Sequence, residues 1–385
     1  MTSTALSDNL APVAFMDLGT QRDRLRGKID AAIGGVVDHG QYILGPEVRE
    51  LESQLADYCG VAACVGCASG TDALLLPLLT EGVGPGDAVF VPSFTFVATA
   101  EVVVLTGATP VFVDVDEATH LIDLMSLEVA IADARELGLT PRAIIPVDLF
   151  GQPADYAAIS AIAKEAGLLV IADAAQSFGA QQGNQRVGKL ARITATSFFP
   201  SKPLGCFGDG GALFTDDEEF AARLRSARVH GAGIDKYDNA RVGINSRLDT
   251  IQAAILLAKM TIFDDEIAAR QRVASNYDTG LGDCVQTPRI VKDNASAWAL
   301  YTIVTPPRDR LRGGLTEIDI PTRVYYPTPL HLQPAYSHHP TASTGLAVSE
   351  RLASQVLSLP MHPYLDGAAQ DRVIQAVRDL IGSFS

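Results

Sequence analysis

Lys202 lies in a stretch of the chain whose composition suits a reactive amine. Residues 196–211 surround it with hydroxyl, aromatic and glycine residues, and Asp209 is the only other charged residue among them. A lysine amine is nucleophilic only when it is unprotonated, and apolar surroundings lower its pKa toward that state. A surface lysine in a glycine-rich turn is the alternative, because lysines are mostly exposed. Lys202 is therefore a candidate nucleophile whose role depends on the groups that the fold brings beside it.

Asp173 is predicted to be a buried carboxylate. It follows an apolar run, residues 168–172, and precedes two alanines. Burying a carboxylate is costly unless a cation or hydrogen-bond donors meet it. Asp173 could serve as a cap or in an internal salt bridge, since structural ion pairs also bury carboxylates. It could instead be the partner of a protonated heterocyclic nitrogen in a ligand.

Gly70 and Thr71 could bind an anion. They stand where an expected strand gives way to a helix, whose N-terminus would offer backbone N–H groups beside the threonine hydroxyl. Ser69-Gly-Thr is also an ordinary N-cap sequence. Phe94 or Phe96 could stack on a flat ring, although either could equally belong to the core. A lysine, a buried aspartate, an anion-binding turn and an aromatic together match the requirements of pyridoxal phosphate.

Short apolar strands alternate with helices through most of the chain. Strands are expected at 62–67, 88–91, 109–115, 143–147, 168–171, 194–198 and 211–215. Helices are expected at 17–38, 47–59, 73–79, 97–106, 127–137, 156–166 and 217–229. Almost wholly apolar strands between helices predict a mostly parallel sheet buried on both faces, in an α/β fold. Ligands bind beyond the carboxyl ends of such strands, which is where Gly70, Phe96, Asp173 and Lys202 fall.

The C-terminal part of the chain predicts a smaller α+β domain packed on the first. A long helix should follow Asp249 and continue to about Tyr277. The remaining expected elements are a strand at 298–304, a loop or helix at 308–315, and helices at 352–357 and 371–381. We place the large domain at residues 1–255 and the small domain at residues 256–385.

Composition narrows the classes of function. With 385 residues, 47% hydrophobic and 19% charged, the chain should form two globular domains. A net charge of −15 argues against nucleic-acid and anionic-membrane partners, and no apolar run approaches the ~20 residues that span a bilayer. The polar N-terminus, residues 1–9, lacks a signal core, and the first dozen residues should form a frayed tail. These features predict a cytoplasmic protein.

Five cysteines are few and odd in number, which suits a reducing compartment. Cys64-x-x-Cys67 has no second cysteine or histidine pair at zinc spacing nearby. We interpret it as part of a buried strand, with a metal or redox role as the weaker alternative. No metal is expected at the candidate site.

An ordered series of motifs resembles the DegT/DnrJ/EryC1/StrS sugar aminotransferases over essentially the whole chain. Its first half comprises Gln41-Tyr-Ile-Leu-Gly-Pro46, Ala68-Ser-Gly-Thr-Asp-Ala73, Pro92-Ser-Phe-Thr-Phe-Val-Ala-Thr99, Pro110-Val-Phe-Val-Asp114 and Pro146-Val-Asp-Leu-Phe-Gly151. Its second half comprises Asp173-Ala-Ala-Gln-Ser177, Ser197-Phe-Phe-Pro-Ser-Lys202, Gly208-Asp-Gly-Gly211, Gly243-Ile-Asn-Ser-Arg-Leu-Asp249 and Tyr326-Pro-Thr-Pro-Leu-His331. The resemblance implies a fold-type I pyridoxal-phosphate transferase that aminates nucleotide-linked keto sugars.

The resemblance also implies roles for residues around the cofactor ring. Lys202 would bind the cofactor covalently and, once released, carry the proton between substrate carbon and cofactor. Asp173 would keep the pyridine nitrogen protonated, and Gln176 would contact the ring hydroxyl. Phe96 is the expected stacking aromatic.

Further roles follow for the phosphate and the substrates. Gly70, Thr71 and Ser197 would hold the phosphate, with Asn245 reaching across from a second subunit of a homodimer. Arg247 would project into the neighbouring site, where a guanidinium suits a carboxylate.

Tyr326 and His331 would lie near the sugar. Ser69 departs from the asparagine of many relatives, with little expected consequence. Tyr325 replaces a histidine found in some relatives, which puts the sugar-side contacts in question. Lys202 is retained, whereas a deoxygenating subgroup of the family carries histidine there.

Within the family, three segments are most similar to enzymes that act on UDP-2-acetamido-2-deoxy-3-oxo-glucuronic acid: residues 197–206, 241–247 and 361–365. The resemblance then implies ping-pong transfer of an amine from L-glutamate to that keto sugar. A dTDP-linked 3-keto or 4-keto 6-deoxyhexose is the alternative substrate. A non-catalytic regulator that binds the cofactor is the alternative from another class. A dinucleotide-dependent dehydrogenase is disfavoured, because no Gly-x-Gly-x-x-Gly follows the early strand.

Overall fold

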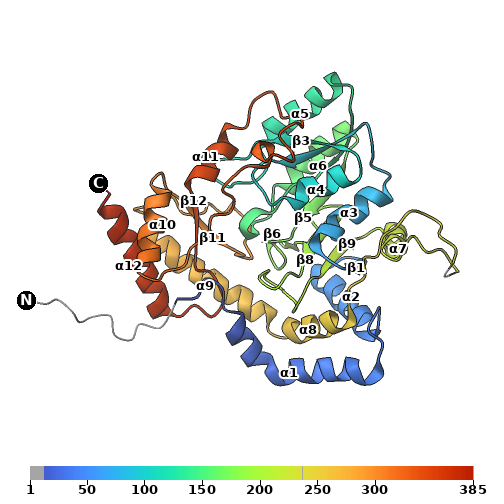
Figure 1. The fold of residues 1–385 in the computed structure, drawn as a ribbon, viewed down its shortest axis with the longest axis horizontal. Helices are drawn as coiled ribbons and strands as arrows, with labels where there is room; N and C mark the ends of the chain where they lie inside the picture. The colour runs from blue at the N-terminus through green and yellow to red at the C-terminus, as the bar shows by residue number, and fades with distance from the viewer. Residues whose placement is uncertain (1–12, 236, 385) are drawn as a thin grey trace, which may run out of the picture.

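A seven-stranded sheet forms the centre of the protein (Figure 1). The computed structural model describes residues 13–235 and 237–384, so the predicted N-terminal tail lies outside the described residues. The order of strands across the sheet is β1-β9-β8-β5-β4-β2-β3. Their bounds are β1 (Ala63–Cys67), β2 (Asp87–Pro92), β3 (Thr109–Val113), β4 (Thr140–Ile144), β5 (Leu169–Asp173), β8 (Ile193–Ser197) and β9 (Gly211–Thr215).

The sheet is parallel apart from β9, which runs antiparallel to both of its neighbours, β1 and β8. Successive side chains of a strand point to opposite faces, and here both faces are buried. Val89 and Val91 of β2 pack into one core, and Ala88 and Phe90 pack into another on the opposite side. The predicted α/β fold with a mostly parallel sheet is confirmed. Cys64 and Cys67 lie inside the buried strand β1, as predicted.

Helices cover both faces of the sheet. Those of the first part of the chain are α1 (Leu18–His39), α2 (Pro46–Cys59), α3 (Gly70–Thr80), α4 (Ala98–Leu105), α5 (Leu124–Glu136), α6 (Tyr156–Ala166), α7 (Glu218–Ala227) and α8 (Thr250–Met260). Helix α8 packs against α1 and α2 along the lower border of the molecule in Figure 1. Within the described ranges, no helix combines the length and the hydropathy needed to cross a bilayer.

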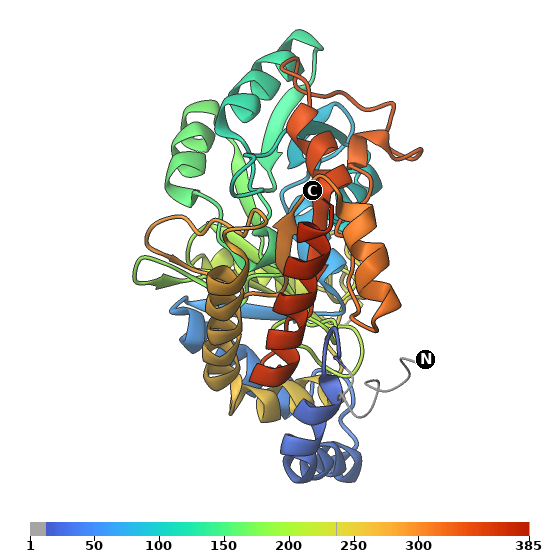
Figure 2. The same cartoon turned by 90° about the vertical axis from the view of Figure 1, so that its left-hand side faces the viewer.

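A second, smaller core lies beside the sheet. It is built around the two-stranded sheet of β11 (Tyr301–Val304) and β12 (Val356–Leu359), with α9 (Phe263–Leu281), α10 (Arg308–Glu317) and α12 (Gly367–Gly382). Helices α9 and α12 pack side by side (Figure 2). The remaining elements are α11 (Ala347–Gln355), the turns η1 (Leu149–Gly151) and η2 (Leu330–Leu332), and the small sheet of β6 (Gln181–Gln182), β7 (Gln185–Arg186) and β10 (Asn294–Ala295). The division between domains after residue 255 stays a prediction.

The expected long helix from Asp249 to Tyr277 is wrong as a single element. It breaks into α8 and α9 at Thr261 and Ile262, where Thr261 Oγ1 donates to Ala258 O at 2.8 Å. Both residues at the break are β-branched, which lowers their helix propensity. A new helix start is favoured just beyond, because carboxylates stabilise a helix N-terminus. The first turn of α9 carries Asp264, Asp265 and Glu266.

The expected helix at 352–357 is also wrong at its end. Helix α11 stops at Gln355, and β12 begins at Val356. Pairing with β11 and the reciprocal backbone bonds between Ser358 and Arg323 hold this segment extended. Tertiary pairing therefore outweighs the local helical pattern, as it commonly does for strand residues.

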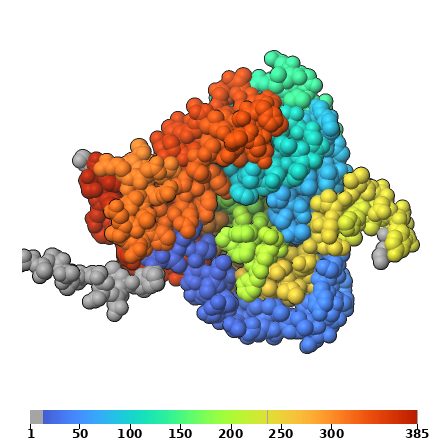
Figure 3. Space-filling model, in the orientation of Figure 1, coloured from blue at the N-terminus to red at the C-terminus, as the bar shows by residue number. Residues whose placement is uncertain are grey.

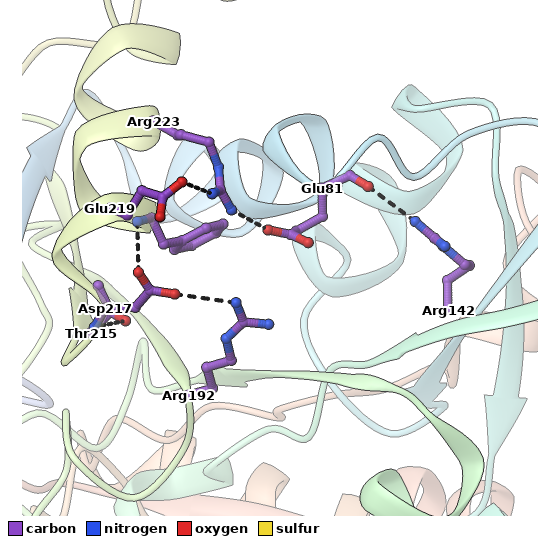
Figure 4. A network of polar contacts seen from close by, with 8 residues as sticks. Glu81, Arg142, Arg192, Thr215, Asp217, Glu219 and Arg223 are labelled. Carbon is purple, nitrogen blue, oxygen red and sulfur yellow. Dashed lines mark hydrogen bonds and ion pairs between the residues drawn. The ribbon is translucent and has the colours of Figure 1, made fainter.

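The amino ends of the parallel strands carry paired charges (Figure 4). Arg223 of α7 bonds to Glu81 at 2.7 Å, and Arg192 pairs with Asp217 at 3.3 Å. Arg142 donates to the backbone oxygen of Glu81, at the C-terminus of α3, at 3.0 Å. This edge is held by ion pairs and helix capping, whereas the residues predicted to bind a ligand lie at the opposite edge.

Candidate active site

Asp173 ends the buried strand β5, which brings its carboxylate to the carboxyl edge of the sheet. Thr99 Oγ1 donates to Oδ2 at 2.9 Å, and the backbone N of Ala175 donates to Oδ1 at 3.2 Å. Burial raises the pKa of Asp173, while these two bonds and the charge of Lys202 act in the opposite direction. A carboxylate held this way favours a further cationic partner.

Lys202 lies in the hairpin that joins β8 to β9. The hairpin continues the ladder beyond the strands, because Phe198 N donates to Gly210 O and Cys206 N donates to Phe198 O, both at 2.8 Å. A tight turn then places Lys202 N 2.9 Å from Phe199 O. Burial lowers the pKa of the Lys202 ammonium, and the charge of Asp173 raises it. Lys202 is half-buried, and its charge and that of Asp173 act on each other. Burial biases the lysine toward its nucleophilic form.

Gly70 and Ser197 lie against each other at the predicted phosphate site. Gly70 and Thr71 open α3, and the Ser69 side chain caps that helix by accepting from Asp72 N at 3.1 Å. A Cβ atom added to Gly70 would lie 2.6 Å from Ser197 Cβ and 3.0 Å from its hydroxyl oxygen. Only glycine leaves room for the helix N-terminus to meet the end of β8. The structure therefore brings the three residues predicted to hold an anion to one place.

Replacing Gly70 by alanine is expected to weaken phosphate binding and to lower stability by about 1–3 kcal/mol, since the added methyl group must displace Ser197. Titration with pyridoxamine phosphate measures the affinity, and thermal unfolding of the cofactor-free protein measures the stability. Gly27→Ala is the matched control, because a Cβ at this helical glycine meets nothing within 4 Å. Unchanged affinity in Gly70→Ala would contradict a phosphate site at this position.

Gln176 and Tyr326 join the two parts of the molecule at this edge. Gln176 Oε1 accepts from the backbone N of Phe150 at 2.7 Å, and its Nε2 donates to the Tyr326 hydroxyl at 3.2 Å. The ring of Phe96 is half exposed and lies 6.1 Å from that of Tyr326 between centroids, whereas Phe94 is buried in the core. Of the two aromatics considered, Phe96 alone is accessible to a ligand. Its stacking role stays a prediction.

Asn245 and Arg247 lie on the segment between α7 and α8, which extends away from the body of the molecule (Figure 3). The Asn245 side chain is exposed and that of Arg247 is half-buried. Between them, Ser246 is buried, and its hydroxyl donates to Asp72 Oδ2 at 2.6 Å and accepts from Ala68 N at 3.2 Å. The segment is therefore fixed to the start of α3, while its neighbouring side chains remain available to a ligand or a second copy of the chain.

His331 bonds through both ring nitrogens. Nδ1 lies 2.6 Å from the hydroxyl oxygen of the fully buried Ser93, and Nε2 lies 3.2 Å from Glu350. The ring links the end of β2 to α11, so it fixes the chain that follows Tyr326. Contact of His331 with a sugar stays a prediction.

Two residues near Asp173 were missed by sequence reasoning. Thr99 sits in an apolar helix, and nothing in that pattern indicated that it would meet a carboxylate. Asp148 did carry a signal, because it ends an apolar run as Asp173 does. Its carboxylate is fully buried and accepts from Ser177 Oγ at 2.6 Å, from the Tyr156 hydroxyl at 2.7 Å and from Ala154 N at 2.9 Å.

Asp148 is expected to make the stability of the cofactor-free protein depend on pH. Burial raises its pKa from 3.8 to about 7, against the lowering effect of its three donors. The folded state then binds more protons than the unfolded state between about pH 4 and pH 7, so this contribution to stability is lost as the pH rises through that window. Asp148→Asn should reduce the change in the free energy of unfolding between these pH values, by at most about 4 kcal/mol.

Urea unfolding at several pH values measures this effect. Asp57→Asn, at an exposed carboxylate, provides the control and should leave the pH dependence as it is in the wild type. If the free energy of unfolding of Asp148→Asn changes with pH as it does in the wild type, Asp148 is ionised in the folded protein throughout this pH range.

Known proteins are similar to this chain over most of its length. The family model of the DegT/DnrJ/EryC1/StrS aminotransferases matches residues 23–378. UDP-2-acetamido-2-deoxy-3-oxo-D-glucuronate aminotransferase of Pseudomonas aeruginosa is 51% identical over 360 residues, covering 93% of this chain and 97% of that protein. dTDP-3-amino-3,4,6-trideoxy-alpha-D-glucose transaminase of Streptomyces venezuelae is 42% identical, covering 95% and 96%.

Solved structures agree with the fold. A DegT DnrJ EryC1 StrS aminotransferase from Brucella abortus superposes with a TM-score of 0.95 at 55% identity, covering 96% of this chain and 99% of that one. NtdA from Bacillus subtilis, solved with bound cofactor PMP, superposes with a TM-score of 0.86 at 31% identity, covering 98% and 86%. The chain belongs to the DegT/DnrJ/EryC1/StrS aminotransferase family.

Proposed function

We propose that this protein transfers the amino group of L-glutamate to the 3-keto group of UDP-2-acetamido-2-deoxy-3-oxo-D-glucuronic acid, using pyridoxal phosphate. The observation that carries the proposal is the buried Asp173 carboxylate at the carboxyl end of β5, whose charge interacts with that of the half-buried Lys202, together with the Gly70–Ser197 contact at the end of β8. The named relative at 51% identity supports the choice of sugar. Such a reaction would serve the synthesis of a bacterial surface polysaccharide in the cytoplasm.

The residues present fit pyridoxal phosphate. Among the residues that the structure describes, one donor meets each oxygen of the buried Asp173 carboxylate, so its remaining lone pairs suit a protonated ring nitrogen. The start of α3 lacks a side chain at Gly70 and offers N–H groups to a phosphate. Gln176 would contact the ring hydroxyl and Phe96 would stack on the ring. Thr71 and Ser197 would complete the phosphate site with their hydroxyls.

When bound, pyridoxal phosphate supplies an electron sink for the carbon that gains or loses the amine. Lys202 would hold the cofactor covalently through Nζ. Once free, the same Nζ would carry the proton between the substrate carbon and the cofactor. Burial favours the unprotonated amine that this task requires. Asp173 would keep the ring nitrogen protonated, and the bond from Thr99 would orient the carboxylate.

The active unit in this proposal is a homodimer with shared sites. Exposed Asn245 would reach the phosphate of the partner copy, and Arg247 would bind the carboxylates of glutamate and of the sugar uronate in turn. Tyr326 and His331 would border the sugar. The bonds that join Ser246 to Asp72 and Ala68 fix this segment, so Asn245 and Arg247 would be held in place for these contacts.

Arg247→Ala is expected to raise the KM for glutamate and for the sugar by about 10- to 100-fold each, since a hydrogen bond to a charged group contributes ~1.5–3 kcal/mol. Each half-reaction is followed separately by the absorbance of the cofactor. Arg272→Ala, on the exposed face of α9, is the matched control. Unchanged KM values for both substrates would count against binding of their carboxylates by Arg247.

One experiment tests the proposal as a whole. Purified protein is loaded with pyridoxal phosphate, converted by L-glutamate to the pyridoxamine form, and then offered a panel of UDP- and dTDP-linked keto sugars. Return of the original absorbance with the UDP-3-oxo-uronate alone is the expected result. Turnover of a dTDP-keto-6-deoxyhexose instead would favour the alternative substrate, a dTDP-linked keto sugar. The Streptomyces venezuelae relative at 42% identity supports that alternative. Failure of glutamate to convert the cofactor would favour a non-catalytic regulator.

A further inference from the structure

Lys259 is a buried lysine outside the residues assigned above. It lies on α8 with 2% of its surface exposed, and its Nζ donates to Gly205 O at 2.6 Å. The same Nζ lies 4.7 Å from the centre of the Phe207 ring, within the range of a cation–π contact. Burial lowers its pKa to about 8. Burying an ammonium is costly, so its hydrogen bond to Gly205 O and its contact with the Phe207 ring must offset that cost.

Those contacts all fall on the hairpin that carries Lys202. The chain turns back on itself at Gly205, where an added Cβ would lie 2.5 Å from Pro200 O and 2.7 Å from Phe199 O. Backbone carbonyls crowded into a turn need donors from elsewhere, because they cannot pair within a ladder. Lys259 supplies one of them to Gly205 O. The turn that sets the position of Lys202 is therefore closed by a side chain from another element.

Helix α8 holds the hairpin at a second point. Gln252 Oε1 accepts from the backbone N of Phe207 at 2.9 Å. Gln252 and Lys259 are seven residues apart on the same helix, which places them on one face, two turns from each other. The helix thus contacts the hairpin at both Gly205 and Phe207.

Helix α8 is itself firmly placed. Ile255 and Ala258 pack with Leu25 and Ile29 of α1, while other apolar residues of α8 pack with α2. The segment just before α8 is fixed to the start of α3 through Ser246. One rigid helix therefore connects the predicted phosphate site to the Lys202 hairpin.

We propose that Lys259 and Gln252 are positioning residues that hold the Lys202 hairpin so that the Lys202 amine meets the cofactor aldehyde. This inference rests on the proposed function, since it assumes pyridoxal phosphate at the site. Neither residue would touch the cofactor. Their loss should slow covalent capture at Lys202 and leave the phosphate site intact.

The test separates capture from binding. Pyridoxamine phosphate lacks the aldehyde and cannot bond to Lys202, so its Kd reports the phosphate and ring contacts alone. The rate of the absorbance change on adding pyridoxal phosphate reports covalent capture, and borohydride reduction followed by peptide mass measurement locates the bond. Both are measured on the cofactor-free full chain, together with its thermal unfolding midpoint.

Lys259→Met and Gln252→Met should slow capture at least 10-fold while changing the Kd of pyridoxamine phosphate less than 3-fold. Gln252→Glu keeps an accepting oxygen for Phe207 N and should restore the wild-type rate. Lys28→Met is the matched control, because this exposed lysine bonds to Thr261 just beyond α8, away from the hairpin. If Lys259→Met fails to fold, the pair of Gln252 variants decides the question.

Wild-type capture rates in Lys259→Met and Gln252→Met would overturn the inference. So would a loss of pyridoxamine phosphate affinity equal to the loss in capture rate, because that pattern marks collapse of the whole site. Failure of the wild-type protein to capture pyridoxal phosphate at Lys202 would instead refute the proposed function, and this inference with it.

Discussion

Replacing Lys202 by alanine is expected to abolish covalent cofactor binding and to lower the transamination rate on the order of 10⁴-fold, the upper range for loss of a positioned acid–base group. Two roles are removed together, because Nζ both holds the cofactor and carries the proton. Borohydride reduction with peptide mass measurement checks the bond. Conversion of glutamate to 2-oxoglutarate in a single turnover checks the proton transfer.

The control for this variant is Lys164→Ala, which removes an exposed lysine of α6. It should retain the wild-type rate and the cofactor bond at Lys202. Binding of pyridoxamine phosphate should persist in Lys202→Ala, because the predicted phosphate contacts come from α3 and β8. A reducible bond to another lysine together with wild-type turnover would contradict the assignment.

Asp173→Asn is expected to lower the transamination rate by about 10²- to 10⁴-fold. Removing one partner of a buried charge pair costs ~3–5 kcal/mol, and each 1.36 kcal/mol corresponds to a factor of ten in rate. Asparagine retains the shape of the side chain but cannot hold a proton on the ring nitrogen. Single-turnover kinetics with glutamate measures the loss.

The stability of the cofactor-free protein shows whether the loss of rate in Asp173→Asn reflects misfolding. Burial raises the pKa of Asp173 above 3.8, so the ionised carboxylate destabilises the folded state once the pH passes through its pKa. Asp173→Asn should therefore unfold at pH 8 no more readily than the wild type. Thr99→Val removes one of the two hydrogen bonds and should show a smaller loss of rate, about 10-fold. A wild-type rate in Asp173→Asn would exclude the proposed role.

The sequence allowed prediction of the parts of the fold that depend on local pattern. Apolar runs marked the strands, and the polar residues that end them marked the edge where Asp173 and Ser197 lie. Burial followed from the same pattern, so the environment of Asp173 was predictable. The glycine at position 70 could be recognised as a candidate, but its contact with Ser197 joins the start of α3 to the end of β8, which are far apart in the chain.

Other features depend on contacts that no local pattern reveals. The antiparallel direction of β9 follows from a hairpin that reverses the chain after Phe198. Thr99 and Lys259 each lie in an apolar helix, and only the folded packing brings one to Asp173 and the other to Gly205. The division between α8 and α9 reflects two β-branched residues followed by acidic ones, a weak signal inside an otherwise helical stretch.

The place of β1 at the edge of the sheet has a consequence for the order in which the protein is built. Within the described parts of the chain, β1 pairs with β9 alone, so the ladder that includes Cys67 forms only after Gly211 has been synthesised. Contacts between such distant segments are slow to form, because a long loop must close first. During synthesis the start of α3 would be complete long before its partner emerges. The strand that leads into α3 therefore joins the sheet late, and a chain that ends before β9 would leave β1 without its neighbour in the sheet.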